Sequence, residues 1–155
     1  MSFLSKIKDF VGFTGLKVNN ERPNLELPYQ TKQYAFPYVL QAGHRLDIID
    51  IRQTVRVQRS GFDECVEELV LADKLASKTA PENLHFPLAI EKGEQLHYPL
   101  SFEFDLAEAL KKWEINSVEE ALKANLKFEV LLQIDIKETF YAFDPEVRFI
   151  LELKA

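Results

Sequence analysis

Apolar and polar side chains alternate through the C-terminal quarter of the chain, with almost no exception between residues 126 and 136. The apolar positions there are Leu126, Phe128, Val130, Leu132, Ile134 and Ile136. After residue 146 the parity reverses, and the apolar positions are Val147, Phe149, Leu151 and Leu153. A period of two is typical of strands with one buried face. The stretch Leu126–Leu153 therefore predicts a β-hairpin.

Asp144-Pro145 predicts the turn of this hairpin, because Asp suits the first position of a type I turn and Pro the second. A four-residue loop over Phe143–Glu146 then sets the strand register. Apolar residues face each other along most of the hairpin: Ala142 and Val147, Phe140 and Phe149, Ile136 and Leu153. We therefore expect Phe140 and Phe149 to form a buried cross-strand pair.

Glu138 is the one residue that this register places wrongly, on the core face opposite Leu151. A β-bulge over Lys137–Thr139 would turn its side chain outward. If it stayed buried, its carboxyl would have a raised pKa and Glu138 would become a candidate functional carboxylate. We expect the bulge or a place at the open rim, because an unpaired buried carboxylate is costly.

Several earlier segments also show strand patterns. They are Leu16–Val18, Leu25–Pro28, Phe36–Leu40, Leu46–Val57, Leu84–Ile90 and Leu96–Phe104. Pro37 would confine its strand to a sheet edge, and the change of parity at Ile48–Ile49 predicts a bulge. The turn residues 91–94 predict a second hairpin in which Ile90 faces Leu96.

The outward positions of the long segment Leu46–Val57 and its continuation are polar or charged, and we interpret them as a solvated face. They are Asp50, Arg52, Thr54, Arg56 and Gln58. The next segment, Phe62–Ser77, has apolar residues at helical spacing and acidic residues near its start, which favours a helix. Its apolar run Leu69–Ala72 also suits a buried strand, so both interpretations stay open.

Short helices are predicted in two other places. Asp105 with Glu108, and Ser117 with Glu120, have the spacing of capping boxes at helix starts. These two helices, between residues 105 and 125, would cover one end of a sheet pair. At the N-terminus, an amphipathic helix over residues 1–12 is predicted from one apolar stripe: Phe3, Leu4, Ile7, Phe10 and Val11.

That N-terminal stripe is the candidate interaction surface of the chain. An isolated helix of this length is marginal in water, so something must hold it. We expect it to pack on the sandwich; docking on a membrane surface or in a partner's groove is the alternative. Two lysines opposed by Asp9 give only weak attraction to anionic lipid.

Composition agrees with one mainly β domain of 155 residues, in which residues 13–155 form an antiparallel, immunoglobulin-like or arrestin-like β-sandwich with short helices. The chain is 46% hydrophobic with a net charge of −6, which argues against nucleic acid as a partner. We expect neither a transmembrane segment nor a signal peptide. One cysteine, Cys65, fits a reducing compartment, so we expect a cytoplasmic protein.

No motif indicates chemistry, and we expect no catalytic, cofactor-binding or metal-binding residues. In the second predicted hairpin, His97 lies beside Ala89 and about 13 Å from His85 at the backbone, too far to share a metal ion. Exposed strand histidines are the simpler interpretation. Cys65 has no histidine near it in sequence, and Ser60-Gly61 lacks the G-x-S-x-G pattern of a nucleophile elbow.

The order of elements resembles one lobe of the arrestin-like β-sandwiches, which include bacterial sporulation-control proteins and trafficking adaptors. The residues that carry the resemblance are EKGE at 91–94, YPLSFEFDL at 98–106, similar to that family's GE…PFSFEL segment, and the closing hairpin over Phe128–Leu153. The resemblance covers residues 34–155. It implies a sandwich that binds proteins or membranes through loops and sheet edges, without catalysis.

Two departures from that family stand out. Its members usually have two lobes, whereas this chain has room for one, and two helices follow Leu106 where the family has a proline-rich loop. No residue here matches the family's phosphate-sensing polar core. We expect a non-enzymatic interaction or scaffold module that binds a protein, or itself, through a sheet edge. The alternatives are a peripheral membrane protein and a ligand-binding or enzymatic domain with a pocket near Trp113.

Overall fold

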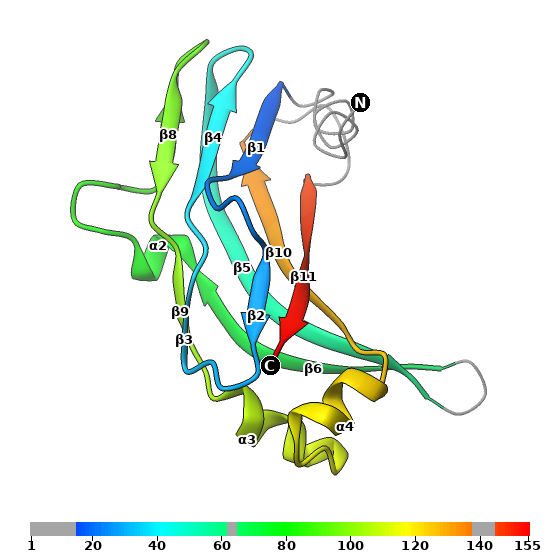
Figure 1. The fold of residues 1–155 in the computed structure, drawn as a ribbon. Coiled ribbons are helices and arrows are strands. Elements are labelled where there is room, and N and C mark those ends of the chain that lie inside the picture. Colours follow the sequence, from blue (N-terminus) through cyan, green and yellow to red (C-terminus); the bar gives the residue numbers. More distant parts are fainter. Residues whose placement is uncertain (1–14, 62–64, 138–144) are drawn as a thin grey trace.

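Two layers of β-strands face each other, and short helices cover one end of them (Figure 1). The computed structural model describes residues 15–61, 65–137 and 145–155. The predicted N-terminal helix, Glu138 and Phe140 lie outside these ranges. No helix among the described residues is long and apolar enough to span a bilayer. The predicted fold class, mainly β with short helices, is confirmed.

The larger layer has six strands. In spatial order they are β2 (Glu26–Pro28), β11 (Glu146–Lys154), β10 (Lys127–Ile136), β5 (Leu46–Ser60) and β6 (Val66–Leu75), and β7 (Leu88–Ile90) pairs with the start of β5. All pairs are antiparallel except β2 with β11, which is parallel. β5 is the longest strand and has β10 along one side and β6 and β7 along the other.

The smaller layer is one ladder interrupted by prolines. Its strands are β1 (Leu16–Asn20), β4 (Tyr38–Ala42) and β8 (Gln95–Tyr98), continued by the pair β3 (Gln33–Ala35) and β9 (Ser101–Glu103). The register Tyr38↔Tyr98 runs on unchanged to Ala35↔Ser101. Pro37 and Pro99 lie in the gap, because proline has no N–H to give to a ladder.

The core fills the space between the layers. Phe149 of β11 meets Phe36 of the smaller layer with ring centroids 5.1 Å apart, and both side chains are buried. The Tyr38 hydroxyl donates across the layers to Gln53 Oε1 at 2.8 Å. Burial raises the pKa of the Tyr38 hydroxyl well above its usual range.

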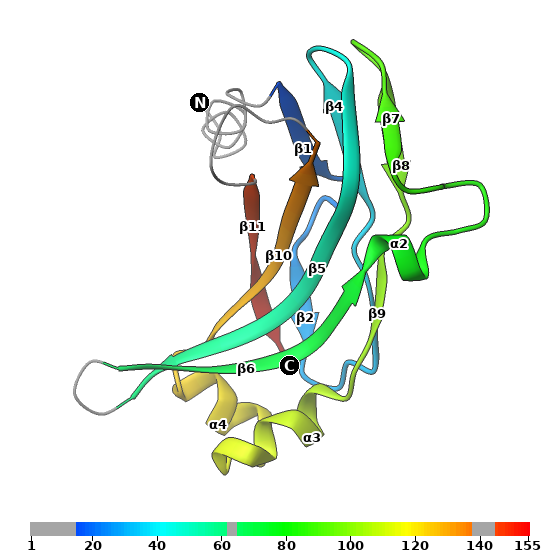
Figure 2. The ribbon, with the colours of Figure 1, turned by 180° about the vertical axis from the view of Figure 1, so that it is seen from behind.

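Short helices close one end of this core. They are α3 (Leu106–Leu110), the 3₁₀ turn η3 (Lys111–Trp113) and α4 (Val118–Lys123), while α2 (Ala76–Thr79) follows β6 (Figures 1 and 2). Both predicted caps are present: Asp105 accepts from the Glu108 N–H at 3.1 Å, and Ser117 from that of Glu120 at 3.2 Å. Leu106 and Leu110 are buried in the core.

The predicted register of the final hairpin is wrong. Phe149 lies opposite Val130, not Phe140, and Ile136 pairs with Ile48 of β5 rather than with Leu153. Moving the partner of Phe149 by ten positions, an even number, leaves every side chain on its predicted face. Alternation therefore predicted the faces of the two strands but not which residues pair. Asp144 lies outside the described residues.

The second predicted hairpin is also wrong, because its two strands belong to different layers. β7 pairs with β5, so that Ile90 faces Leu46, whereas β8 pairs with β4, so that Leu96 faces Leu40. The turn residues 91–94 carry the chain from one layer to the other. Both strands have a buried side, so their alternation is the same in either arrangement.

The helix favoured over Phe62–Ser77 is wrong as well: residues 66–75 form strand β6, and only Ala76–Thr79 are helical. Val55 pairs with Ala72 and Arg56 with Val70, so Leu71 is an extra residue in a β-bulge. The bulge reverses the parity within the strand and leaves apolar residues at a spacing that imitates a helix. Phe62 lies outside the described residues.

Two smaller predictions had opposite outcomes. The bulge at Ile48–Ile49 is confirmed, since Asp135 pairs with Asp50 and Ile136 with Ile48, which leaves Ile49 without a partner in register. The edge position inferred from Pro37 is wrong, because β4 lies between β1 and β8. Pro37 stands just before the strand, where a missing N–H disturbs no ladder.

Candidate interaction surface

β6 forms the edge of the larger layer. Among the described residues its backbone pairs with β5 alone, over the ten residues Val66–Leu75. The β5–β6 hairpin runs out past the other strands (Figures 1 and 2), and among the described residues no strand pairs with the outer side of β6. An unpaired edge of this length presents a row of N–H and C=O groups that a further strand can pair with.

Two valines of β6 are unusually exposed. Val66 is 64% and Val70 57% exposed, and both lie on the face that points away from the smaller layer. A β-branched side chain on an open strand suits contact with another strand better than contact with water. The free edge is thus bordered by apolar surface as well as by unpaired backbone groups.

Charged residues on an edge strand usually protect it from pairing, but on β6 three of them are held by β5. Salt bridges join Asp73 to Arg52 at 2.6 Å, Glu68 to Arg56 at 3.4 Å and Glu67 to Arg59 at 3.0 Å. The hydrogen bond from Arg52 lowers the pKa of the Asp73 carboxyl. These carboxylates are drawn towards the interior of the sheet and away from its free edge.

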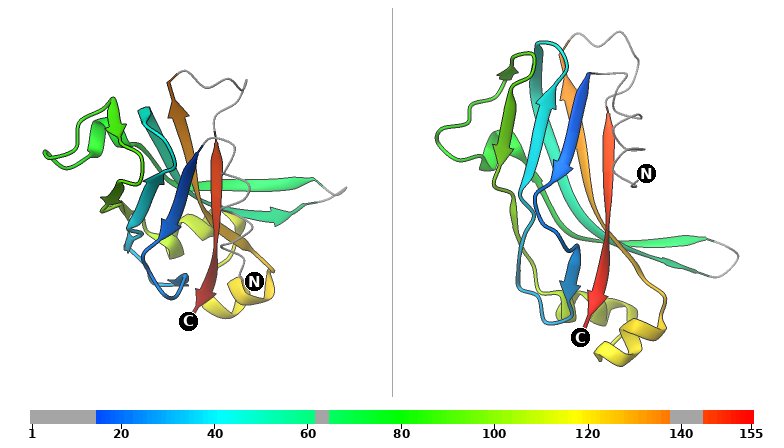
Figure 3. Two further views of the ribbon diagram at one scale, coloured as in Figure 1. Left: turned by 90° about the horizontal axis from the view of Figure 1, so that it is seen from above. Right: turned by 45° about the horizontal axis from the view of Figure 1, so that its top comes forward.

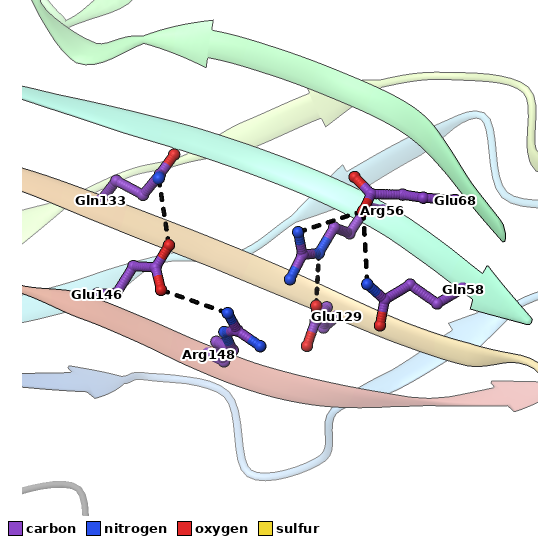
Figure 4. A network of polar contacts seen from close by, with 7 residues as sticks. All are labelled: Arg56, Gln58, Glu68, Glu129, Gln133, Glu146 and Arg148. Carbon is purple, nitrogen blue, oxygen red and sulfur yellow. Dashed lines mark hydrogen bonds and ion pairs between the residues drawn. The ribbon is translucent and has the colours of Figure 1, made fainter. Parts of the chain in front are cut away.

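A buried ion pair lies on the outer face of the same layer (Figure 4). Arg56 Nε donates to Glu129 Oε1 at 2.5 Å, and Glu129 is fully buried while the Arg56 side chain is 14% exposed. Glu129 Oε2 has no hydrogen-bond partner among the described residues. The prediction of a solvated face was therefore wrong for Arg56 and for Thr54, which is 7% exposed.

The rest of the network in Figure 4 is nearer to solvent. Glu146 accepts from Gln133 at 3.2 Å and from Arg148 at 3.3 Å. Exposed pairs of this kind contribute little to stability. The network fixes side chains across β10 and β11 without forming a concave site.

A groove begins between the C-terminal half of β6 and β9 and continues beside α2, and we call it the Lys74 groove. Three open hollows of about 200, 410 and 370 Å³ meet at Lys74. Ala72 and Asp73 line it on one side and Ser101 and Glu103 on the other. The Lys74 ammonium lies 5.5 Å from the centre of the Phe102 ring, a cation–π distance that holds the charge at the groove floor.

The alternative prediction was a pocket near Trp113. In the structure, Trp113 packs against the inner side of the β5–β6 hairpin. The Arg59 guanidinium stacks 4.4 Å from the Trp113 ring centre, and its Nη1 donates to the Trp113 carbonyl at 3.5 Å. None of the three hollows of the Lys74 groove reaches this ring. The contact ties the helical end of the core to the hairpin that carries β6.

His44, His85 and His97 are all exposed. His97 lies opposite Val39 in the smaller layer and contacts Glu21, rather than lying beside Ala89 as predicted. Within residues 15–61, 65–137 and 145–155, no three His, Cys, Asp or Glu side chains are grouped to hold a metal ion. The predicted interaction stripe (Phe3, Leu4, Ile7, Phe10 and Val11) and Glu138 lie outside these residues.

Comparison with solved structures identifies the fold. The crystal structure of Spo0M, a sporulation control protein from Bacillus subtilis, matches 90% of this chain with a TM-score of 0.57 and 14% sequence identity. The chain has a Spo0M-like, arrestin-type fold. It spans 49% of the length of Spo0M. The predicted resemblance is thereby confirmed for the fold.

Two other solved structures match this chain more weakly. A protein from Archaeoglobus fulgidus matches 90% of this chain and 97% of its own at 12% identity, with a TM-score of 0.42. A β-glucosidase from Listeria innocua matches 90% of this chain and 16% of its own at 10% identity, with a TM-score of 0.40. No protein-family model matches the sequence, and no curated protein matches it.

Proposed function

We propose that this chain is a non-enzymatic, cytoplasmic protein-interaction module, and that its partner binds as an added strand on the free edge of β6. The observation that carries the proposal is this edge: ten residues whose outer side no described strand pairs with, two exposed valines, and carboxylates held by salt bridges to β5. Strand addition obtains its affinity from backbone hydrogen bonds and its specificity from alternate side chains. A Spo0M-like sandwich supplies the rigid sheet that such pairing needs.

A random-peptide display library selected against the full chain provides ligands for a test. Val70→Lys places a charge beside the free edge, where lysine discourages pairing. Val70 is more than half exposed, so the change leaves the core intact. Ile150→Lys is the matched control, because Ile150 is 46% exposed on β11, where it lies opposite Glu129 of β10.

We expect selected peptides to bind Val70→Lys at least about tenfold more weakly than the parent chain and Ile150→Lys with unchanged affinity. Amide shifts on peptide binding should concentrate in β6. Equal binding to Val70→Lys, or shifts confined to other strands, would overturn the proposal. Analytical ultracentrifugation of the free chain distinguishes a foreign partner from a second copy, since self-pairing through β6 would give a dimer that Val70→Lys dissociates.

A further inference from the structure

We infer that the Lys74 groove binds acidic side chains of the partner, so that the segment added to β6 is an extended peptide with carboxylates beside Lys74 and, just past the end of the strand, beside Lys78 of α2. The inference rests on the proposed function, because it assigns the chemistry of the partner to one half of the same edge. Its physical basis is an excess of unpaired positive charge at that end of β6.

Within the part of the chain that the structure describes, neither Lys74 nor Lys78 has a carboxylate partner. Neither takes part in an ion pair of the described residues. Asp73 precedes Lys74 in the chain, but its carboxylate already accepts hydrogen bonds from Arg52 and from the Thr54 hydroxyl, the latter at 3.0 Å. On a chain of net charge −6, this end of the groove therefore carries two uncompensated cations.

The position of Lys74 matches an added strand, and Lys78 of α2 follows just past the end of β6. Lys74 lies opposite Gln53 in the ladder, so its side chain is on the inward face of the layer, next to Ser101 of β9. Side chains of an added strand alternate between the two faces. Those on the inward face would enter the groove beside the Lys74 ammonium and the Ser101 hydroxyl, two groups that can donate hydrogen bonds to a carboxylate.

Glu103 determines at which end of the groove a carboxylate of the partner would bind. It lines the end of the groove next to Ala72, away from Lys78, and no ion pair of the described residues neutralises it. A carboxylate of the partner would be repelled there and attracted at the other end, where Lys74, Lys78 and the Arg52–Asp73 ion pair line a hollow of about 410 Å³. The acidic positions of the partner are thus confined to the Lys78 half of the groove.

The probe for this inference is the tightest β6-binding peptide from the display selection, synthesised in three versions. Its positions beside Lys74 and, past the end of β6, beside Lys78 carry glutamate, glutamine or lysine, and the rest of the peptide is unchanged. Each version is titrated against the full chain, against Lys74→Gln/Lys78→Gln and against the control Lys17→Gln/Lys112→Gln. Lys17 and Lys112 are exposed and unpaired among the described residues, so the control loses the same charge elsewhere.

We expect the glutamate peptide to bind about tenfold tighter than the glutamine peptide, as two partly exposed ion pairs predict, and the lysine peptide to bind weakest. The preference should vanish in Lys74→Gln/Lys78→Gln, survive in the control and weaken in high salt. Equal affinity of the glutamate and glutamine peptides, with amide shifts still in β6, would overturn the acidic preference and leave the proposed function standing. Loss of all binding at β6 would overturn both.

Discussion

At the scale of single residues, the Arg56–Glu129 pair shows how a charge is tolerated on a sheet. One oxygen of the buried Glu129 carboxylate is held by Arg56, and the other has no partner among the described residues. Removing only the guanidinium leaves an unpaired buried charge, so we expect Arg56→Ala to lower the free energy of unfolding by about 3–5 kcal/mol. Urea denaturation measures it.

Replacing both members should behave differently. Arg56→Met/Glu129→Leu removes the desolvation cost together with the attraction, so we expect a free energy of unfolding equal to or above that of the parent. If the double variant is as destabilised as Arg56→Ala, the ion pair itself is a net source of stability.

Asp73 is the residue whose ionisation should couple to folding. Because Arg52 lowers its pKa in the folded chain, its contribution is present above the unfolded pKa of about 3.9 and is lost as the pH falls through the lower folded value. We expect Asp73→Asn to be less stable than the parent at pH 7 and to lose less stability on acidification below about pH 4. The pair is exposed, so the effect is small.

Urea unfolding at pH 7, 4 and 3 checks this expectation. Glu82→Gln is the control, because Glu82 is exposed and has no partner among the described residues. A parallel pH dependence of Asp73→Asn and the parent would show that the Arg52 contact has no thermodynamic weight.

At the scale of elements, alternation predicts which side of a strand is buried but not which strand lies beside it. β10 and β11 kept their predicted faces although their register moved by ten positions, and β7 and β8 kept theirs although they joined different layers. β6 was missed because its bulge at Leu71 interrupts the alternation. Within the candidate site, the apolar run Leu69–Ala72 was the one sequence signal for strand β6. The Lys74 groove could not be predicted, because it depends on how β6 and β9 are placed in two different sheets, which no local pattern shows.

A cross-strand disulfide tests the observed register. Gln133 and Glu146 lie directly opposite each other, at the Cα separation that disulfides accept. In a Cys65→Ser background we expect Gln133→Cys/Glu146→Cys to form the bond on mild oxidation, as shown by mass spectrometry. Gln133→Cys/Arg148→Cys, which is diagonal, should stay reduced. In the register of a turn at Asp144-Pro145, Gln133 would have no partner and neither bond would form.

At the scale of the whole molecule, the two layers and the helical end enclose the core, while the β5–β6 hairpin projects from it (Figure 3). The chain spans about half of Spo0M, and its larger layer keeps one long edge open. Strands inside a sheet open only with the whole fold, whereas edge strands exchange through local fluctuations. The arrangement therefore predicts a gradient of stability across the larger layer.

Amide hydrogen exchange measures that gradient. We expect β10 and the paired part of β5 to exchange slowest and the free-edge amides of β6 to exchange fastest within the layer, because only the former are paired on both sides. A bound strand should then protect alternate amides of β6, those that point to the free edge, and leave β10 unchanged. Uniform protection of β6 and β10 in the free chain would mean that the edge of β6 is already covered, and strand addition there would be ruled out.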